Sequence, residues 1–185
     1  MGSSFENLLR QVIEKSESKE WANAVLEWEL IDTFEDLSSS STCVCGKESI
    51  RYLHKIGNSL NGNILYPIGS SCIKKFGRCD LNETIDLKEK LFVLSHAVAS
   101  NAFLELNADL FSRKLIKYLY EAGAFESKLY PAGKNYEFFL KMFNKRNKED
   151  ITELQRKKIT AILLNNIKPF ILNQIKNKII SNRIS

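Results

Sequence analysis

The hydrophobic residues of this chain follow two different periods. Near the N-terminus, apolar residues recur three and four positions apart, which is the spacing of one face of an amphipathic helix: Phe5, Leu8, Leu9, Val12 and Ile13. From Leu26 to Leu30 apolar and acidic residues alternate, and this period of two predicts an edge strand with Trp28 in the core.

A β-hairpin is predicted between residues 49 and 66. The segment 49–58 alternates and places four residues on one face: Ile50, Tyr52, His54 and Ile56. Asn61-Gly62 supplies the dipeptide that tight hairpin turns favour, and residues 63–66 read as the returning strand.

Beyond residue 80 the helical period returns. It predicts helices over about 86–106, 110–122, 136–145 and 151–166. Gly123 is the expected C-cap of the second helix and Thr152 the expected N-cap of the fourth. Pro169 predicts a break in the last helix or its restart.

Three of the four cysteines lie between residues 43 and 72. Cys43 and Cys45 flank one residue and precede Gly46, which is the form of a knuckle that aims two thiolates at one ion. Cys72 follows the capping hydroxyls of Ser70 and Ser71, in the first turn of a short predicted helix that ends at a glycine. A knuckle, a hairpin and a short helix with a ligand in its first turn are the parts of a treble-clef zinc finger.

These residues resemble small treble-clef proteins carried by phages, plasmids and other mobile elements. The shared motifs are Cys-x-Cys-Gly, Ile-x-x-x-His-x-Ile-x-Asn and Ile-Gly-Ser-x-Cys-Ile-x-x-Phe, and with the Glu-Trp-Glu-Leu lead-in the resemblance covers residues 27–80. It implies one structural zinc ion with a ligand set of Cys43, Cys45, His54 and Cys72. Such proteins mostly have no assigned activity, and many treble clefs have two residues between the knuckle cysteines where this chain has only Val44.

Two alternatives to this ligand set are open. Cys79, beyond Cys72, is the rival fourth ligand, although His54 lies in the middle of the hairpin beside the knuckle. The cysteines could also be buried thiols without a metal, since free cysteine behaves as a small hydrophobe. We therefore predict an α+β fold in three parts: an N-terminal helix and edge strand (1–42), a treble-clef zinc finger with a small β-sheet (43–80), and a larger α-helical basic region packed with it (81–185).

Composition is that of a globular protein, with 44% hydrophobic and 26% charged residues. No apolar run reaches the length of a membrane span, and the first residues lack the basic and apolar parts of a signal peptide. We expect a cytoplasmic protein in a reducing compartment, where disulfides are rare and thiolates are available to a metal.

Charge is distributed unevenly along the sequence. The net charge is −6 for residues 1–42, +4 for 43–80, −3 for 81–110 and +10 for 111–185, within an overall +5. This asymmetry predicts a polyanionic partner at the basic part, and the alternative is a solvated lysine-rich surface.

No motif of an enzyme is present. The sequence has no phosphate-binding Gly-rich loop, no Gly-x-Ser-x-Gly, no His-Glu-x-x-His and no zinc-deaminase signature. An ion with four protein ligands has no open position for a substrate or water. We therefore expect a binding protein and not an enzyme.

The sequence favours a nucleic-acid-binding protein, with RNA or single-stranded DNA slightly preferred. Tyr52 and Tyr66 could stack on bases. The candidate phosphate contacts are the cations of the finger and of the basic region: Arg51, Lys55, Lys74, Lys75, Arg78, Lys145, Arg146, Lys148, Arg156, Lys157 and Lys158. The resemblance to mobile-element proteins suggests an alternative, a phage-type inhibitor of a host defence complex (anti-CRISPR-like) that binds a protein or a ribonucleoprotein. A helical dimerising scaffold is a second alternative.

Overall fold

The predicted strands pair into one three-stranded antiparallel sheet of order β1-β2-β3. The strands are β1 (Trp28–Glu35), β2 (Tyr52–Asn58) and β3 (Ile64–Ile68). The register slips between Leu30 and Asp32, so that Ile31 bulges over the sheet. The Ile31 side chain covers Gly57 closely: its Cδ1 atom would lie 2.7 Å from a Cβ atom at that position, so a larger residue there would have to displace it. The α+β class and the small sheet are thus confirmed.

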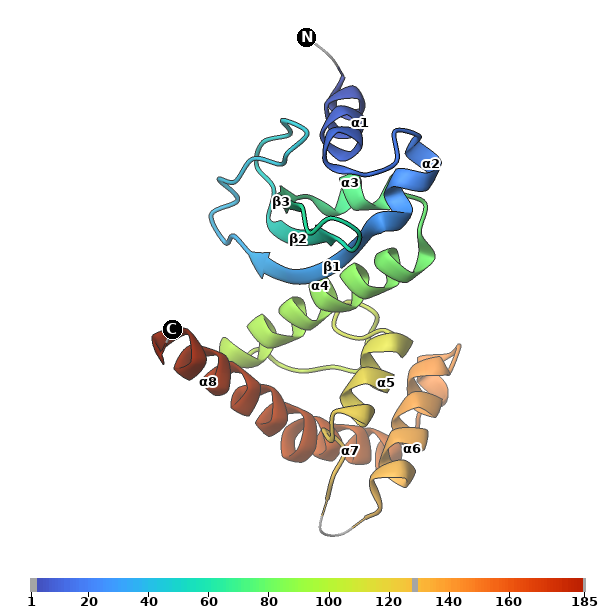
Figure 1. The fold of residues 1–185 in the computed structure, drawn as a ribbon. Helices are drawn as coiled ribbons and strands as arrows, with labels where there is room; N and C mark the ends of the chain where they lie inside the picture. The colour runs from blue at the N-terminus through green and yellow to red at the C-terminus, as the bar shows by residue number, and fades with distance from the viewer. Residues whose placement is uncertain (1–2, 128–129, 185) are drawn as a thin grey trace. The chain divides into compact units, whose positions relative to one another are not determined.

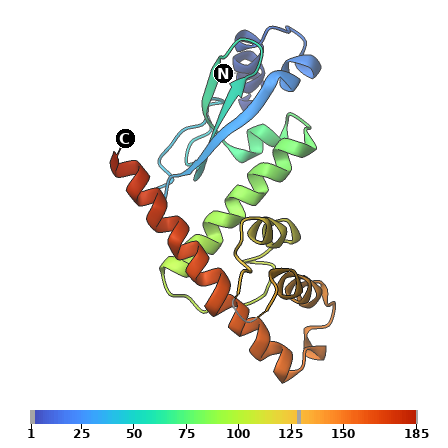
Figure 2. The same cartoon turned by 60° about the horizontal axis from the view of Figure 1, so that its bottom comes forward.

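The computed structural model describes residues 3–127 and 130–184, with side chains up to residue 177. The chain divides into two units, Met1–Glu89 and Lys90–Ser185, which are described separately (Figures 1 and 2). The first unit contains the predicted segments 1–42 and 43–80 together with the beginning of 81–185.

Short helices complete the first unit: α1 (Ser4–Lys15), α2 (Trp21–Ala24), the 3₁₀ turn η1 (Val25–Glu27), α3 (Ser70–Lys74) and the first half of α4 (Cys79–Ala99). Ser3 and Glu6 form a capping box that begins α1. The buried face of α1, carrying Leu8 and Val12, packs in one core with Trp28. The Trp28 indole Nε1 donates to Ser16 Oγ at 2.9 Å, which satisfies its polar atom inside that core.

The second unit is helical. Its elements are the rest of α4, α5 (Arg113–Glu121), α6 (Ala132–Asn144), the 3₁₀ turn η2 (Lys148–Asp150), α7 (Glu153–Ile162), the π-helical turn η3 (Leu163–Ile167) and α8 (Lys168–Ile184). Three fully buried phenylalanines, Phe111, Phe125 and Phe139, pack edge to face at its centre. None of the described helices is long and apolar enough to cross a membrane.

Helix ends agree with the predictions where a local cap decides them. Gly123 has a φ of 88° and ends α5, and Thr152 forms a capping box with Gln155 at the start of α7. The helix predicted to run to residue 106 instead ends at Ala99. Asn101 adopts a φ of 55° there, and the Ala102 N–H bonds back to Ala97 O, which is the Schellman pattern with asparagine in place of glycine.

Pro169 does not break the last helix. It is the second residue of α8, and the turn before it widens from α to π over Leu163–Ile167. Proline lacks an N–H and crowds the preceding turn, and a π turn is a known way to keep a helix continuous around such a defect.

Candidate metal centre

The knuckle is a tight turn between β1 and β2. Gly46 has a φ of +88°, a conformation that a side chain would strain, and its N–H donates to Cys43 O at 2.7 Å. The Val44 N–H donates to Pro67 O at 2.9 Å, which fixes the knuckle to β3. These bonds orient Cys43 and Cys45 on the same side of the turn, both buried.

Cys72 reaches the knuckle from α3. It is the third residue of that helix, and Gly69 at the N-cap donates its backbone N–H to Cys43 Sγ at 3.3 Å. The Sγ atoms of Cys43 and Cys72 are 3.6 Å apart, and the three sulfurs of Cys43, Cys45 and Cys72 all lie within 4.8 Å of one another. The described structure therefore brings together three of the four predicted ligands.

The sulfur geometry fits a tetrahedral ion. Two ligands at the Zn–S distance of about 2.3 Å lie about 3.8 Å apart at the tetrahedral angle, close to the 3.6 Å between Cys43 and Cys72. A disulfide would instead need about 2.05 Å. The hydrogen bond between the Cys43 and Cys72 side chains is the main cause of two opposite pKa shifts. It lowers the pKa of Cys43 and raises the pKa of Cys72. The three cysteines could thus hold a metal ion.

His54 does not join the sulfur group. Its ring is fully buried, and its Nδ1 lies 3.0 Å from Thr33 Oγ1. Its Nε2 lies 3.2 Å from Ser70 Oγ and 3.3 Å from Glu89 Oε1. Both ring nitrogens therefore have partners outside the cysteine cluster, and the ligand role of His54 stays a prediction.

The polar cluster around His54 links four elements of the first unit. Thr33 comes from β1, His54 from β2, Ser70 from α3 and Glu89 from α4. Ser70 Oγ donates to Glu89 Oε1 at 2.5 Å. Burial would raise the pKa of Glu89, but hydrogen bonds from His54 and Ser70 outweigh burial and lower it. The sequence singled out Ser70 only as a helix-capping hydroxyl, whereas in the structure it bonds to His54 and Glu89. Glu89 was missed because it belongs to no recognisable motif.

Cys79, the rival fourth ligand, is the exposed first residue of α4 and lies outside the cysteine group. No fourth His, Cys, Asp or Glu joins that group among the residues with described side chains.

The predicted phosphate contacts of the first unit are largely engaged within it. Arg51 pairs with Glu35 at 2.8 Å, and Lys74 pairs with Asp86 at 3.0 Å. Arg78 forms ion pairs with Glu29 and Asp80, and it also donates to the backbone oxygen of Trp28 at the start of β1. The other two cations are Lys75, whose Nζ is 5.4 Å from the Phe5 ring centroid, and the half-buried Lys55 of β2.

Two cations of the second unit bond to backbone oxygens at the end of α6 and of η2. Lys148 Nζ donates to the backbone oxygens of Met142 and Phe143 at 3.0 and 2.7 Å, and burial lowers its pKa. Lys145 Nζ donates to Asp150 O at 2.5 Å.

The remaining predicted cations lie around the start of α7. Arg156 Nη2 donates to Lys148 O at 2.9 Å, which places the basic part of α7 next to the basic segment 145–148. Lys157 pairs with Glu153 four residues earlier at 2.8 Å. Lys158 Nζ lies 4.4 Å from the centroid of the Phe138 ring, and Arg146 is exposed between α6 and η2.

Compared with protein-family models, curated proteins and solved structures, the chain has no significant match. The assignment of the site therefore depends on its own geometry.

Proposed function

We propose that this chain is a zinc-stabilised nucleic-acid-binding protein. The first unit is its metal-stabilised scaffold, and the second unit makes the contacts to phosphates. The observation that carries this proposal is the separation of charge between the units. Residues 1–89 hold ten Lys and Arg against fourteen Asp and Glu, whereas residues 90–185 hold seventeen against eight. A net of +9 on the second unit favours a polyanionic ligand there.

One zinc ion bound by Cys43, Cys45 and Cys72 in a treble-clef arrangement fits the first unit. Thiolates are soft ligands that select zinc over magnesium or calcium, and buried cysteine clusters of this kind are most often structural. The ion would join the knuckle to the start of α3, where the helix N-terminus also favours negative charge. Because such a site does not exist in the unfolded chain, metal binding would contribute directly to folding.

Phosphate contacts are proposed for the basic segment 145–148 and the start of α7. Arg146 is exposed, and the bond from Arg156 to the Lys148 backbone holds the two segments together. Tyr130 lies against α7, 56% exposed, with the Lys158 ammonium 5.5 Å from its ring centroid. An exposed aromatic ring next to a cation suits an unpaired base stacked above its own phosphate, which favours single-stranded nucleic acid.

Binding measured at several salt concentrations tests this function. Fluorescence anisotropy with single-stranded RNA, single-stranded DNA and duplex DNA should show affinity that falls steeply with salt, because each neutralised phosphate releases counterions. The double variant R146E/K157E should bind more weakly and lower the salt slope by about 0.7 for each lost single-strand contact. The control variant K47E/K88E changes net charge equally in the acidic unit and should bind as the original chain does. If none of the three nucleic acids binds at low salt, the proposal is overturned.

One observation favours the alternative of a protein-binding inhibitor. Four exposed apolar side chains lie on the outer face of the sheet: Ile31, Phe34, Ile64 and Tyr66. Phe34 and Tyr66 pack edge to face at 5.8 Å and form its centre. An exposed apolar face on an acidic unit fits a partner protein with a basic, partly apolar surface. The variant Phe34→Ser should abolish inhibition in such a case and leave nucleic-acid binding unchanged.

A further inference from the structure

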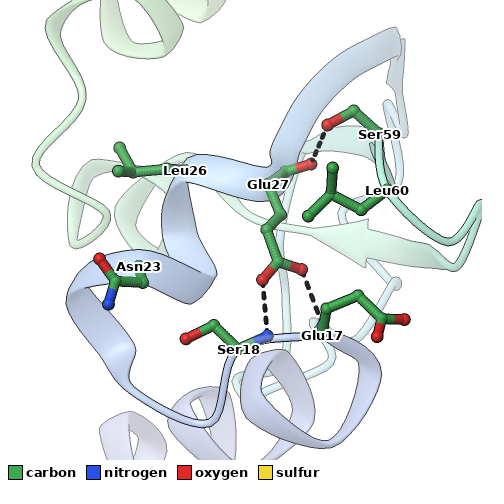
Figure 3. Close-up of a pocket in the computed structure, with 7 residues that line it drawn as sticks. All are labelled: Glu17, Ser18, Asn23, Leu26, Glu27, Ser59 and Leu60. Carbon is green, nitrogen blue, oxygen red and sulfur yellow. Dashed lines mark hydrogen bonds between the residues drawn. The ribbon is translucent and has the colours of Figure 1, made fainter.

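A second site in the first unit is independent of the cysteines and of the basic surface. It is a pocket of about 510 Å³, shown in Figure 3, and its volume lies in the range of about 300–1,000 Å³ that is usual for ligand pockets. Seven residues line it: Glu17, Ser18, Asn23, Leu26, Glu27, Ser59 and Leu60.

Glu27 lines this pocket and is only 6% exposed. Its Oε2 accepts hydrogen bonds from the Glu17 N–H at 2.9 Å and from Asn58 Nδ2 at 2.6 Å, and its Oε1 accepts one from the Ser18 N–H at 2.7 Å. Burial raises the pKa of this carboxyl, but the hydrogen bonds from Asn58, Ser18 and Glu17 outweigh burial and lower it. The pocket therefore holds a nearly buried carboxylate that accepts hydrogen bonds from three neutral donors, the Glu17 N–H, the Ser18 N–H and Asn58 Nδ2.

The rest of the lining carries no positive charge. Asn23 donates one of its two amide N–H groups to Glu20 at 2.8 Å, and its carbonyl oxygen is an acceptor. Ser59 Oγ donates to the Glu27 backbone oxygen at 3.0 Å, and the exposed Glu17 adds a second carboxylate. The nearest cation that acts on Glu27, Lys19, donates instead to the Ile13 and Ser16 backbone oxygens. The lining is thus complementary to a positively charged group with many donors and no acceptor.

Two leucines flank this acidic pocket. Leu26 is 61% exposed and Leu60 is 68% exposed, and Figure 3 shows them on either side of Glu27. Both side chains therefore leave apolar surface free on either side of the carboxylate. The site is therefore larger than one charged group requires.

We propose that this pocket binds an arginine side chain of a partner protein, with apolar neighbours of that arginine packed on Leu26 and Leu60. Guanidinium has five donors and no acceptor, and its stem covers apolar surface more readily than a small cation does. The net charge of −4 on residues 1–89 attracts a basic partner to this unit. The exposed leucines favour a polypeptide over a free guanidinium compound, since only a polypeptide brings flanking side chains.

An NMR titration of the full chain tests this proposal. The probe is the blocked tripeptide acetyl-Leu-Arg-Leu-amide, and the backbone amides of Glu17, Ser18 and Leu60 report on the pocket. We expect saturable shifts at these amides, and binding about tenfold weaker or worse when citrulline, a neutral isostere, replaces the arginine. Leu60→Ser should weaken the tripeptide to a similar extent. Leu37→Ser, which alters a 71% exposed leucine outside the lining, should not.

Three results would overturn the proposal. The first is the absence of saturable shifts at millimolar tripeptide, and the second is equal binding of the citrulline peptide. The third is methylguanidinium binding as tightly as the tripeptide, which would make the site a small-molecule pocket. Leu60→Ser is used because Leu60 is exposed and its replacement should leave the fold intact. Glu27→Gln would remove a carboxylate that holds the fold together through three hydrogen bonds. Nucleic-acid binding in the second unit should be the same in Leu60→Ser, so the two proposals fail separately.

Discussion

The sulfur atoms of Cys43 and Cys72 lie 3.6 Å apart, although the two residues are 29 positions apart in the chain. One comes from a turn between strands and the other from a short helix, and Gly69 bonds the helix start to the Cys43 sulfur. An ion at this point would cross-link the knuckle to α3, whose Ile73 already shares one hydrophobic core with Ile56 and Ile68 of the sheet. The stability of the first unit should therefore depend on the metal.

Cys72→Ser should remove the metal and unfold the first unit. Structural zinc sites in small domains have apparent binding free energies of about 10–16 kcal/mol, which is comparable to the whole free energy of unfolding of a typical domain, about 5–15 kcal/mol. Elemental analysis and a thermal melt of the purified variant measure both effects. Cys79→Ser is the matched control, because Cys79 is exposed and outside the cluster, and it should retain one equivalent of metal. A Cys72→Ser protein with the original melting temperature would contradict a structural metal.

His54→Ala should lose stability. The ring is buried with partners on both nitrogens, so its removal leaves Thr33, Ser70 and Glu89 without their shared partner. Buried polar groups without a partner cost about 1–3 kcal/mol each, which would appear as a lower melting temperature. Metal content decides the ligand question. Loss of one equivalent of zinc in His54→Ala would show that His54 is the fourth ligand, as the resemblance implies.

The parts of the site that could be predicted from the sequence are the local ones. The knuckle and the hairpin turn around Asn61-Gly62 each depend on a few consecutive residues, and both are present. The short helix α3 is present too, but its N-cap is Gly69, and the predicted capping by the Ser70 and Ser71 hydroxyls is wrong. The surroundings of His54 could not be predicted in this way. Alternation indicates which face a strand residue occupies, but Glu89 meets His54 only because α4 packs beside the sheet. The end of α4 was missed because the hydrophobic spacing continues past Asn101, whose backbone conformation stops the helix.

Charge shows the same limit. Cations can be counted in the sequence, but their partners cannot be identified there. The ion pair Arg51–Glu35 joins residues 16 positions apart, and Lys74–Asp86 joins residues 12 positions apart. Such pairs become visible only once strands and helices are packed. The basic patch predicted for the finger is consequently smaller in the structure than in the sequence.

Asp36→Asn should destabilise the first unit at neutral pH. Asp36 organises the serine-rich loop before the knuckle, where its Oδ2 accepts hydrogen bonds from the backbone of Ser40 and from the backbone and hydroxyl of Ser41, and its Oδ1 accepts from Ser38. These bonds, the one from the Ser38 hydroxyl first, hold the pKa of Asp36 far below its ordinary value of 3.8. The stabilisation is therefore present above pH 3.8 and is lost as the pH falls toward the lower folded pKa.

Thermal melts between pH 7 and pH 2 measure this effect. The melting temperatures of Asp36→Asn and the original chain should differ at pH 7 and converge as the carboxylate becomes protonated. Glu48→Gln, which neutralises an exposed acid in the neighbouring loop, should change little at either end of the range. A constant difference across the whole range would show that the carboxylate charge has no part in holding the loop.

Tyr130→Ala should weaken single-stranded nucleic acid and leave its salt dependence nearly unchanged. Stacking of a base on an aromatic side chain contributes about 1–3 kcal/mol, and it releases no counterions. The matched control is Tyr66→Ala, which removes an exposed tyrosine of the acidic unit that packs against Phe34 and was itself a candidate for stacking. Anisotropy titrations of both variants at two salt concentrations distinguish the two sites. If Tyr66→Ala loses affinity and Tyr130→Ala does not, the base stacks on Tyr66, and the nucleic-acid-binding surface is the sheet of the first unit.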